Sequence, residues 1–400
     1  MDILQKLDLA DKFHNHLVDS GVNNAIAPKV EIKTATTGYV NGREVILAGT
    51  NNYLGLTFNK HCIQQSINAT QEFGTGTTGS RLANGSYDSH LLLEQELSEL
   101  LGTKSTIVFT TGYVANLGAI STLVSQGDNI VLDADCHASI YEAAKLSGAN
   151  IYRFKHNDVA DLDKKLARLK NQIKQTLVIT ESMYSMLGDF SPLESICNVV
   201  EKHGAYLLLD DAHSFGIMGK NGRGYADSLG LSNRIDFVTG TFSKSLGSIG
   251  GFFTSHKHNI SSLRTQIKAY MFTASNVPSV IASTRAALEI LKTGAHLRKR
   301  LWNNCKEVHG ALSARGFDLG ASPSPVIAAI MPDSITAGKF WNSLFESGIY
   351  VNLVVPPGAP RNLSLLRCSL SAAHSDGQIA KIISAYKKLP IASVSQISTA

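Results

Sequence analysis

The stretch Ala205-Tyr206-Leu207-Leu208-Leu209-Asp210-Asp211-Ala212-His213 places a continuous apolar run directly before two acidic residues. Strands that are apolar at successive positions, without alternation, are typical of a parallel sheet that is covered on both faces. Longer amphipathic segments separate this run from similar runs at residues 105–109, 129–132, 177–180 and 237–240. The pattern predicts an α/β domain with a mostly parallel sheet and crossover helices.

The sequence pattern changes near residue 285, where helical segments give way to a mixture of short strands and helices. This region has helical runs at 280–291 and 298–315, strands at 326–330, 350–354 and 365–371, and a last helix at 378–388. The first 50 residues predict a helix and then a β-hairpin at 38–47. We therefore expect an N-terminal arm (1–55), a large domain (56–285) and a smaller α+β domain (286–400).

Composition narrows the class of protein. The chain has 400 residues, of which 44% are hydrophobic and 17% charged, so it is a folded globular protein and not a disordered one. Its net charge of +5 is too small to indicate a nucleic-acid partner. Five scattered cysteines without a CxxC pair, and a start that does not resemble a signal peptide, predict a cytoplasmic protein. Peripheral contact with a membrane stays an open alternative.

Asp210 and His213 follow the apolar run at the point where the strand should end. A carboxylate there is costly unless a positive group meets it. The protonated pyridine nitrogen of pyridoxal 5'-phosphate (PLP) is such a group, and His213 could hydrogen-bond the phenolic oxygen of that cofactor. An aspartate that caps a helix is the competing interpretation.

Lys244 lies in Thr239-Gly240-Thr241-Phe242-Ser243-Lys244-Ser245-Leu246-Gly247, where small and hydroxylated residues surround it and no acidic residue is present. Such an amine can lose its proton and attack a carbonyl carbon to form a Schiff base. Hydroxyls and glycines next to it could also hold an anion. An ordinary loop lysine is the alternative.

Two more segments begin helices after predicted strands. Gly112, in Thr110-Thr111-Gly112-Tyr113-Val114-Ala115-Asn116, lies where backbone N–H groups could bind a phosphate. The ring of His137, in Asp133-Ala134-Asp135-Cys136-His137-Ala138-Ser139, could stack on an aromatic cofactor, although a lone histidine is more often structural. Gly74-Thr75-Gly76-Thr77-Thr78-Gly79 follows a helical segment, so it does not indicate a dinucleotide site. His256 and His258 lack partners at ligand spacing, so we expect no metal site.

With these residues together, the chain resembles the α-oxoamine synthases, which are fold-type-I PLP enzymes that condense an amino acid with an acyl-CoA and release carbon dioxide. The resemblance runs from Asn51-Asn52-Tyr53-Leu54-Gly55-Leu56 to Leu365-Leu366-Arg367-Cys368-Ser369. Its other motifs are Gly79-Ser80-Arg81, His90 with Leu93-Glu94, Thr111-Gly112-Tyr113, Asp135-Cys136-His137-Ala138-Ser139 and Ser185-Met186-Leu187-Gly188-Asp189. Within the family, the sequence around Lys244 looks most like that of the soluble bacterial serine palmitoyltransferases.

The resemblance implies a large domain with a seven-stranded type of sheet and a set of roles for individual residues. It assigns catalysis to Lys244, His137, Asp210 and His213. The implied PLP-binding residues are Gly112, Tyr113, His137, Ser185, Asp210, His213, Thr241, Ser243, Lys244 and Thr273. The implied substrate-binding residues are Asn51, Tyr53, Arg81 and Arg367. The family also implies a homodimer with a composite active site, in which Thr273 reaches the phosphate in the neighbouring subunit.

The implied reaction joins L-serine to a long-chain acyl-CoA and yields 3-ketosphinganine, CoA and carbon dioxide, the first step of sphingolipid synthesis. Val355 stands before Pro356-Pro357, where the serine palmitoyltransferases carry an arginine. This departure leaves open a sister activity, meaning that of another α-oxoamine synthase. Such an enzyme would use glycine or alanine, or a different acyl-CoA, and would be of the aminoketone or 8-amino-7-oxononanoate type. A catalytically idle homologue that acts as a binding subunit is a third alternative, which the presence of Lys244 disfavours.

Overall fold

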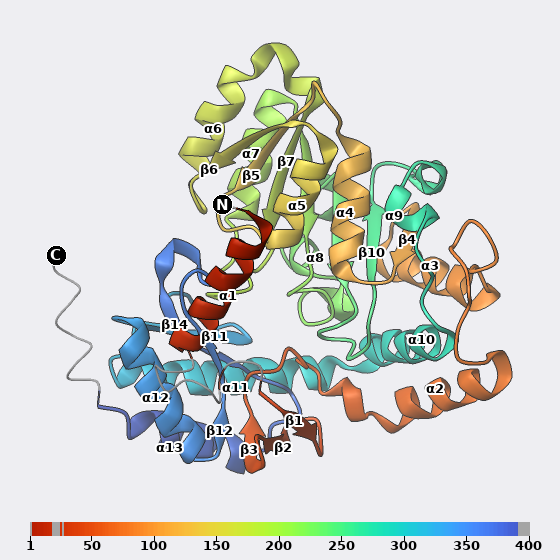
Figure 1. Ribbon diagram of the computed structural model, residues 1–400. Helices are drawn as coiled ribbons and strands as arrows, with labels where there is room; N and C mark the ends of the chain where they lie inside the picture. Colours follow the sequence, from red (N-terminus) through yellow and green to blue (C-terminus); the bar gives the residue numbers. More distant parts are fainter. Residues whose placement is uncertain (1, 18–24, 26–27, 391–400) are drawn as a thin grey trace. The chain divides into compact units, whose positions relative to one another are not determined.

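The computed structural model describes residues 2–17, 25 and 28–390, which group into two compact units (Figure 1). One unit comprises Leu54–Ser185 and Asp189–Arg298, and the other comprises the described residues of Met1–Tyr53, Met186–Gly188 and Lys299–Ala400. The expected division began the small domain at residue 286 and gave residues 1–55 an arm of their own. In the structure the boundary lies at residue 298/299, and the described residues up to and including Tyr53 group with the C-terminal part.

A seven-stranded sheet forms the centre of the larger unit, in the order β4-β10-β9-β8-β7-β5-β6. All neighbours pair in parallel except β10, which is antiparallel to both β4 and β9. The strands are β4 (Ser105–Phe109), β5 (Asn129–Asp133), β6 (Asn150–Phe154), β7 (Thr176–Glu181), β8 (Tyr206–Asp210), β9 (Phe237–Thr241) and β10 (Gly251–Ser255). The predicted α/β class with a mostly parallel sheet is confirmed.

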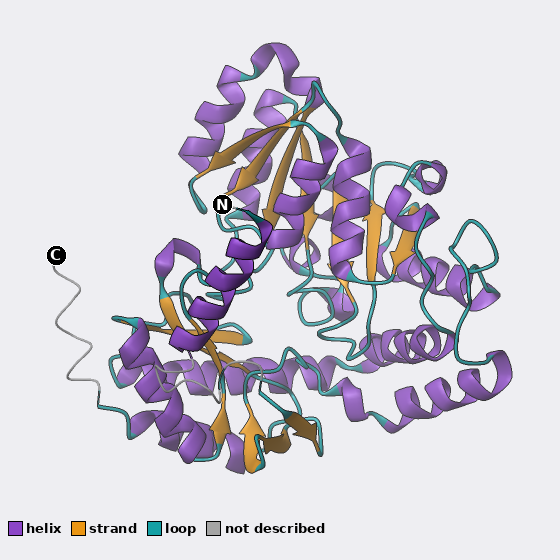
Figure 2. Ribbon diagram, in the orientation of Figure 1, coloured by secondary structure: helices purple, strands orange, loops and turns teal. Residues whose placement is uncertain are grey.

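The larger unit also contains helices, several of which flank the sheet (Figure 2). Their bounds are α2 (Lys60–Phe73), α3 (Asp88–Leu101), α4 (Gly112–Leu123), α5 (Ala138–Ser147), α6 (Val159–Arg168), α7 (Leu193–His203), α8 (Tyr225–Ser228), α9 (Lys268–Met271) and α10 (Pro278–Thr293). Helices α4 and α5 pack together over a core in which Ile130, Ile179 and Leu208 are fully buried. Burying one such side chain contributes roughly 2 kcal/mol, so this core holds the strand ends in fixed positions.

The smaller unit contains two sheets, β1-β2-β3-β12 and β11-β14-β13. Its elements are α1 (Ile3–Leu17), β1 (Val30–Ile32), β2 (Thr37–Val40), β3 (Arg43–Leu47), β11 (Val326–Met331), α12 (Ser334–Glu346), β12 (Ile349–Tyr350), β13 (Asn352–Val354), β14 (Ser364–Ser369) and α13 (Asp376–Lys387). Helix α11 (Ala295–Ala314) crosses the boundary between the two units. The single strand expected at 350–354 is wrong, because the chain leaves one sheet at Tyr350 and enters the other at Asn352. Within the residues that the structure describes, no helix combines the length and apolarity needed to cross a bilayer.

A group of three charged side chains, the buried Glu94 and Arg81 and the partly buried Arg264, joins α3 to β4 and to the segment before α9. Glu94 accepts hydrogen bonds from Arg81 Nη1 at 3.1 Å, from the Val108 N–H at 2.9 Å and from Arg264 Nη2 at 2.8 Å. The side chains of Glu94 and Arg81 are 5% and 4% exposed. Because both charges are removed from water, each depends on the other for compensation.

We expect Glu94→Gln to lower the free energy of unfolding by about 3 kcal/mol, because it leaves the Arg81 guanidinium buried without its counter-charge. Glu96→Gln on the same helix is the matched control. Glu96 pairs with Arg285 where the side chains are 25% and 31% exposed, so its loss should cost less than about 1 kcal/mol. Equilibrium urea unfolding measures both variants, and equal losses would contradict the assigned role of Glu94.

Candidate active site

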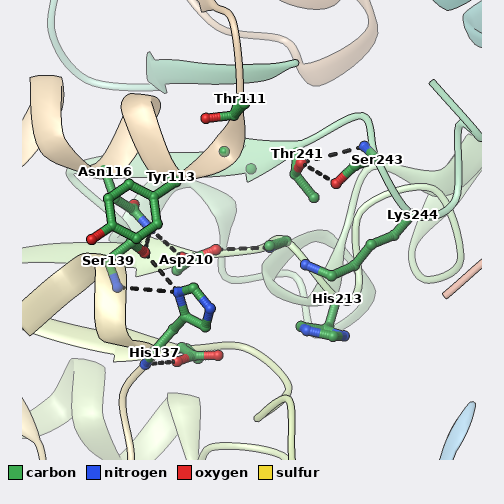
Figure 3. Close-up of a pocket in the computed structure, with 14 residues that line it drawn as sticks. Thr111, Tyr113, Asn116, His137, Ser139, Asp210, His213, Thr241, Ser243 and Lys244 are labelled. Carbon is green, nitrogen blue, oxygen red and sulfur yellow. Dashed lines mark hydrogen bonds between the residues drawn. The ribbon is translucent and has the colours of Figure 1, made fainter. Parts of the chain in front are cut away.

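The segments that follow β4, β5, β7, β8 and β9 surround a cavity of about 260 Å³ in the larger unit (Figure 3). Because parallel strands end at the same edge of a sheet, side chains distant in sequence meet there. The residues that line the cavity are Thr111, Gly112, Tyr113, Asn116, His137, Ser139, Glu181, Asp210, Ala212, His213, Gly240, Thr241, Ser243 and Lys244. The four predicted catalytic residues therefore lie together.

Lys244 lies on a tight turn between β9 and β10. Phe242 and Leu246, on either side of it, are 0% and 1% exposed, so the core anchors both ends of the turn. Ser245 Oγ donates to the Phe215 carbonyl at 2.6 Å, and the Gly247 N–H donates to the Lys244 carbonyl at 3.0 Å. The half-buried lysine side chain extends into the cavity toward Asp210 and His213 (Figure 3). A rigid backbone thus presents a flexible amine.

Asp210 is the last residue of β8 and is 5% exposed. Its Oδ2 accepts a hydrogen bond from Asn116 Nδ2 at 2.7 Å, and its Oδ1 accepts from the Ala212 N–H at 2.9 Å. Asn116 is itself oriented, because its Oδ1 accepts from Thr239 Oγ1 at 2.7 Å. These donors stabilise a carboxylate in a fixed orientation at the cavity wall.

His137 precedes α5, and its ring faces the cavity (Figure 3). Burial, which is the largest cause, and the nearby Lys244 lower the pKa of His137, and Asp210 opposes them. Nδ1 accepts from the Ser139 N–H at 3.2 Å and lies 2.8 Å from Ser139 Oγ. A neutral ring that accepts at Nδ1 carries its proton on Nε2.

Glu181, the last residue of β7, holds the same segment from the other side, because its carboxyl group accepts a hydrogen bond from the His137 N–H. It pairs in register with Asp210 on β8. Burial and the adjacent Asp210 raise the pKa of Glu181 well above its ordinary value. The raised pKa favours the neutral form of the Glu181 carboxyl group next to Asp210.

The start of α4 forms a site suited to an anion. Thr111 caps this helix through a hydrogen bond from the Val114 N–H at 3.0 Å. A Cβ atom at Gly112 would lie 2.8 Å from Thr241 Cβ, and one at Gly251 would lie 2.6 Å from Gly112 Cα. Only glycine permits this close approach, which brings backbone N–H groups near the hydroxyls of Thr241 and Ser243.

These groups match the chemical parts of PLP. A buried carboxylate suits the pyridinium nitrogen, a neutral imidazole suits a ring face, an amine suits the aldehyde, and a helix start with hydroxyls suits the phosphate.

Three of the predicted site residues that belong to the larger unit do not line this cavity. Arg81 is in the buried ion pair with Glu94. Thr273 is half-buried, and together with Arg81 it lines a small separate cavity beside Tyr270. Half-buried Ser185 lies in the loop that follows β7. The roles of these residues stay predictions.

The smaller unit brings together Asn51, Tyr53 and Arg367, which are the other predicted substrate-binding residues. Arg367 Nη2 donates to Asn51 Oδ1 at 3.2 Å, and Tyr53 Oη donates to the same oxygen at 3.4 Å. Burial raises the pKa of Tyr53 to about 12, so its phenol is neutral. Burial lowers the pKa of Arg367, yet a guanidinium remains charged at physiological pH.

Sequence reasoning missed Asn116, Ser139 and Glu181 as site residues. Asn116 and Ser139 lie within quoted motifs, but Asn116 acts through partners on β8 and β9, and Ser139 is bound by Asn116 from α4. Glu181 follows the apolar run at 177–180, just as Asp210 follows its own run. The same argument about a carboxylate at a strand end could have found it.

Comparison with known proteins agrees with the geometry. The model of the family "Aminotransferase class I and II" matches residues 43–385. A serine palmitoyltransferase of Caulobacter vibrioides is 50% identical over 358 residues, which cover 90% of this chain and 89% of that protein. An 8-amino-7-oxononanoate synthase of Symbiobacterium thermophilum is 35% identical over 350 residues, covering 88% and 89%.

Among solved structures, a lysine-to-alanine variant of the serine palmitoyltransferase from S. paucimobilis, with a bound PLP–myriocin aldimine, superimposes with a TM-score of 0.93. It is 43% identical and covers 97% of this chain and 98% of its own. The chain therefore belongs to the aminotransferase class I and II family, and within it to the PLP-dependent α-oxoamine synthases that include the bacterial serine palmitoyltransferases.

Proposed function

We propose that this protein condenses L-serine with a long-chain acyl-CoA to form 3-ketosphinganine, CoA and carbon dioxide. One observation carries the proposal: a single cavity gathers Lys244, Asp210, His137 and His213 in a chain that is 50% identical to a serine palmitoyltransferase. When bound, PLP would withdraw electrons from the α-carbon of the amino acid.

The residues of the cavity divide the remaining work. Lys244 Nζ would attach the cofactor and later remove the α-proton of serine. The Asp210 carboxylate, fixed by Asn116, would hold a proton on the pyridine nitrogen. His137 would lie against the cofactor ring and present its Nε2–H toward the acyl thioester carbonyl. His213 and Ser185 would serve the phenolic oxygen.

Substrate recognition is assigned to the group in the smaller unit. Arg367 would bind the carboxylate of the amino acid, since a guanidinium can engage both carboxylate oxygens, and Asn51 and Tyr53 orient it. Val355 stands where serine palmitoyltransferases carry an arginine, so Arg367 carries more of this task here. The 50% identity to the serine palmitoyltransferase of Caulobacter vibrioides exceeds the 35% identity to the oxononanoate synthase, which favours serine over the sister activity.

The proposal includes a homodimer in which Thr273 contributes to the phosphate site of the neighbouring subunit. Phe272 supports it, because 78% of this large apolar side chain is exposed beside Thr273. A cytoplasmic location is also part of the proposal, and five buried cysteines with free thiols are consistent with it.

Lys244→Ala should abolish the visible absorbance of lysine-bound PLP and lower turnover by at least about 1000-fold, because the amine acts in both attachment and proton transfer. Visible spectroscopy and a CoA-release assay measure the two effects. Lys202→Ala is the control, since Lys202 pairs with Asp163 on the surface. Condensation by Lys244→Ala at a rate near wild type would refute the mechanism.

Asp210→Asn should retain bound PLP but lower kcat about 100-fold, because a neutral amide cannot stabilise a pyridinium charge. The amide would also place N–H donors opposite the Asn116 amide. Spectra report the bound cofactor, and steady-state kinetics report kcat. A surface change, Asp163→Asn, should leave both unchanged, and a near-normal kcat in Asp210→Asn would exclude the proposed role.

Titration with L-serine should change the visible spectrum saturably at lower concentration than titration with glycine or L-alanine. CoA release should then require a long-chain thioester. A spectral change that saturates with glycine but not with serine would instead establish the sister activity. If the protein kept PLP but released no CoA with any combination of amino acid and acyl-CoA, it would be the catalytically idle homologue.

A further inference from the structure

The ring of His156 lies between two carboxylates. His156 follows β6, its Nδ1 lies 2.9 Å from Asp133 Oδ1, and its Nε2 lies 2.7 Å from Asp189 Oδ2. Its side chain is 13% exposed and that of Asp133 is fully buried. Both ring nitrogens thus face carboxylate oxygens, and a nitrogen without a hydrogen would set its lone pair against an oxygen, whereas a neutral imidazole has a single N–H. An imidazolium supplies both, so the geometry favours a charged ring.

Asp133 shapes the segment that leads to His137. It is the last residue of β5, its Oδ1 accepts from the Asp135 N–H at 2.8 Å, and its Oδ2 accepts from the Asn157 N–H at 2.8 Å. One carboxylate therefore ties the turn before His137 to the segment that follows β6.

Asp189 anchors the loop that contains Ser185. Its carbonyl accepts from the Tyr184 N–H at 2.9 Å, and the Ser191 N–H donates to the Ser182 carbonyl at 3.2 Å. Asn157 Nδ2 also donates to Asp189 Oδ2, at 2.9 Å. The His156–Asn157 pair is thus bonded to both loops at once.

We infer that His156 is a positioning residue. Its imidazolium ring joins the loop that carries His137 to the loop that carries Ser185, and so fixes the position of the His137 ring in the active site. This inference rests on the proposed function, because that function places His137 against the cofactor. The hydrogen bonds that His156 makes to the two loops do not depend on the proposed function.

The surroundings of His156 decide its charge. Burial lowers the pKa of His156, but hydrogen bonds to Asp133 and Asp189 outweigh it and raise the value from 6.5 to about 10. Asp135 Oδ2 adds a negative charge 3.7 Å from Nδ1. The Tyr184 ring meets the imidazole edge-on at 4.5 Å, and burial raises the pKa of its phenol, which therefore stays neutral.

Because folding raises the pKa of His156, protonation of its ring stabilises the folded protein. Stability contributed by the charged ring is complete below pH 6.5 and is lost as the pH rises toward 10. The cross-link is therefore present throughout the neutral range.

His203 offers a matched comparison. Its Nε2 lies 2.7 Å from Asp163 Oδ1, and its side chain is 14% exposed. This carboxylate is 37% exposed and also binds Lys202. His203 therefore shares the burial of His156 but engages one partly solvated carboxylate, which belongs to α6.

The first test uses the wild-type holoenzyme labelled with ¹⁵N-histidine. Long-range ¹H–¹⁵N spectra, assigned with His156→Gln, should show both ring nitrogens of His156 protonated from pH 6 to pH 9. An unprotonated ring nitrogen at pH 7.5 would overturn the inference, because it would place the proton on a carboxyl group instead. This measurement requires no turnover, so it separates failure of the link from failure of the proposed function.

The second test is kinetic. His156→Gln should keep bound PLP but lower kcat about 10- to 100-fold through misplacement of His137, with KM for serine changed much less. His203→Gln should leave kcat unchanged. Asp189→Asn, which removes one partner without touching the His137 loop, should reproduce the loss in kcat. Wild-type kcat in a folded, PLP-loaded His156→Gln, or in Asp189→Asn if the former does not fold, would overturn the inference.

Discussion

The active site depends on a buried carboxylate that is held ready for a positive partner. Asp210 loses its water at the end of β8, and the amide of Asn116 and the Ala212 N–H replace that water. These neutral donors orient the carboxylate, but they carry no positive charge that would compensate its negative charge. A cationic ring nitrogen completes the arrangement, which explains why a residue costly to bury occupies this position.

Sheet topology turns that local chemistry into a site. The parallel strands end at one edge, and five of them, β4, β5, β7, β8 and β9, supply the cavity with residues from their last positions or from the segments that follow them. The antiparallel β10 brings Gly251 against Gly112, so the start of α4 and the Lys244 turn lie close together. The anion site and the amine are therefore consequences of one strand order.

The fold was predictable where burial is continuous and was not where it is partial. The run at 105–109 matches β4, because all its residues are buried. Residues 150–154 form the edge strand β6, where four of five residues are exposed, so no apolar run marks it. Lys244, Asp210 and His137 carry local signals, whereas Asn116 acts on Asp210 from 94 residues away and is recognisable as a site residue only in the folded chain.

The distribution of charge around His137 follows from hydrogen bonding. Glu181 and Asp210 are adjacent on neighbouring strands, and two buried carboxyl groups so placed resist holding two negative charges. Asp210 accepts two hydrogen bonds that favour a carboxylate, while burial and that carboxylate raise the pKa of Glu181. Glu181 therefore holds the His137 backbone through a carboxyl group whose raised pKa favours the neutral form. On the other side of the same loop, the Asp133 carboxyl group lies 2.9 Å from the His156 ring. The loop that carries His137 is thus held by two buried acidic side chains, each with its own hydrogen-bond partner.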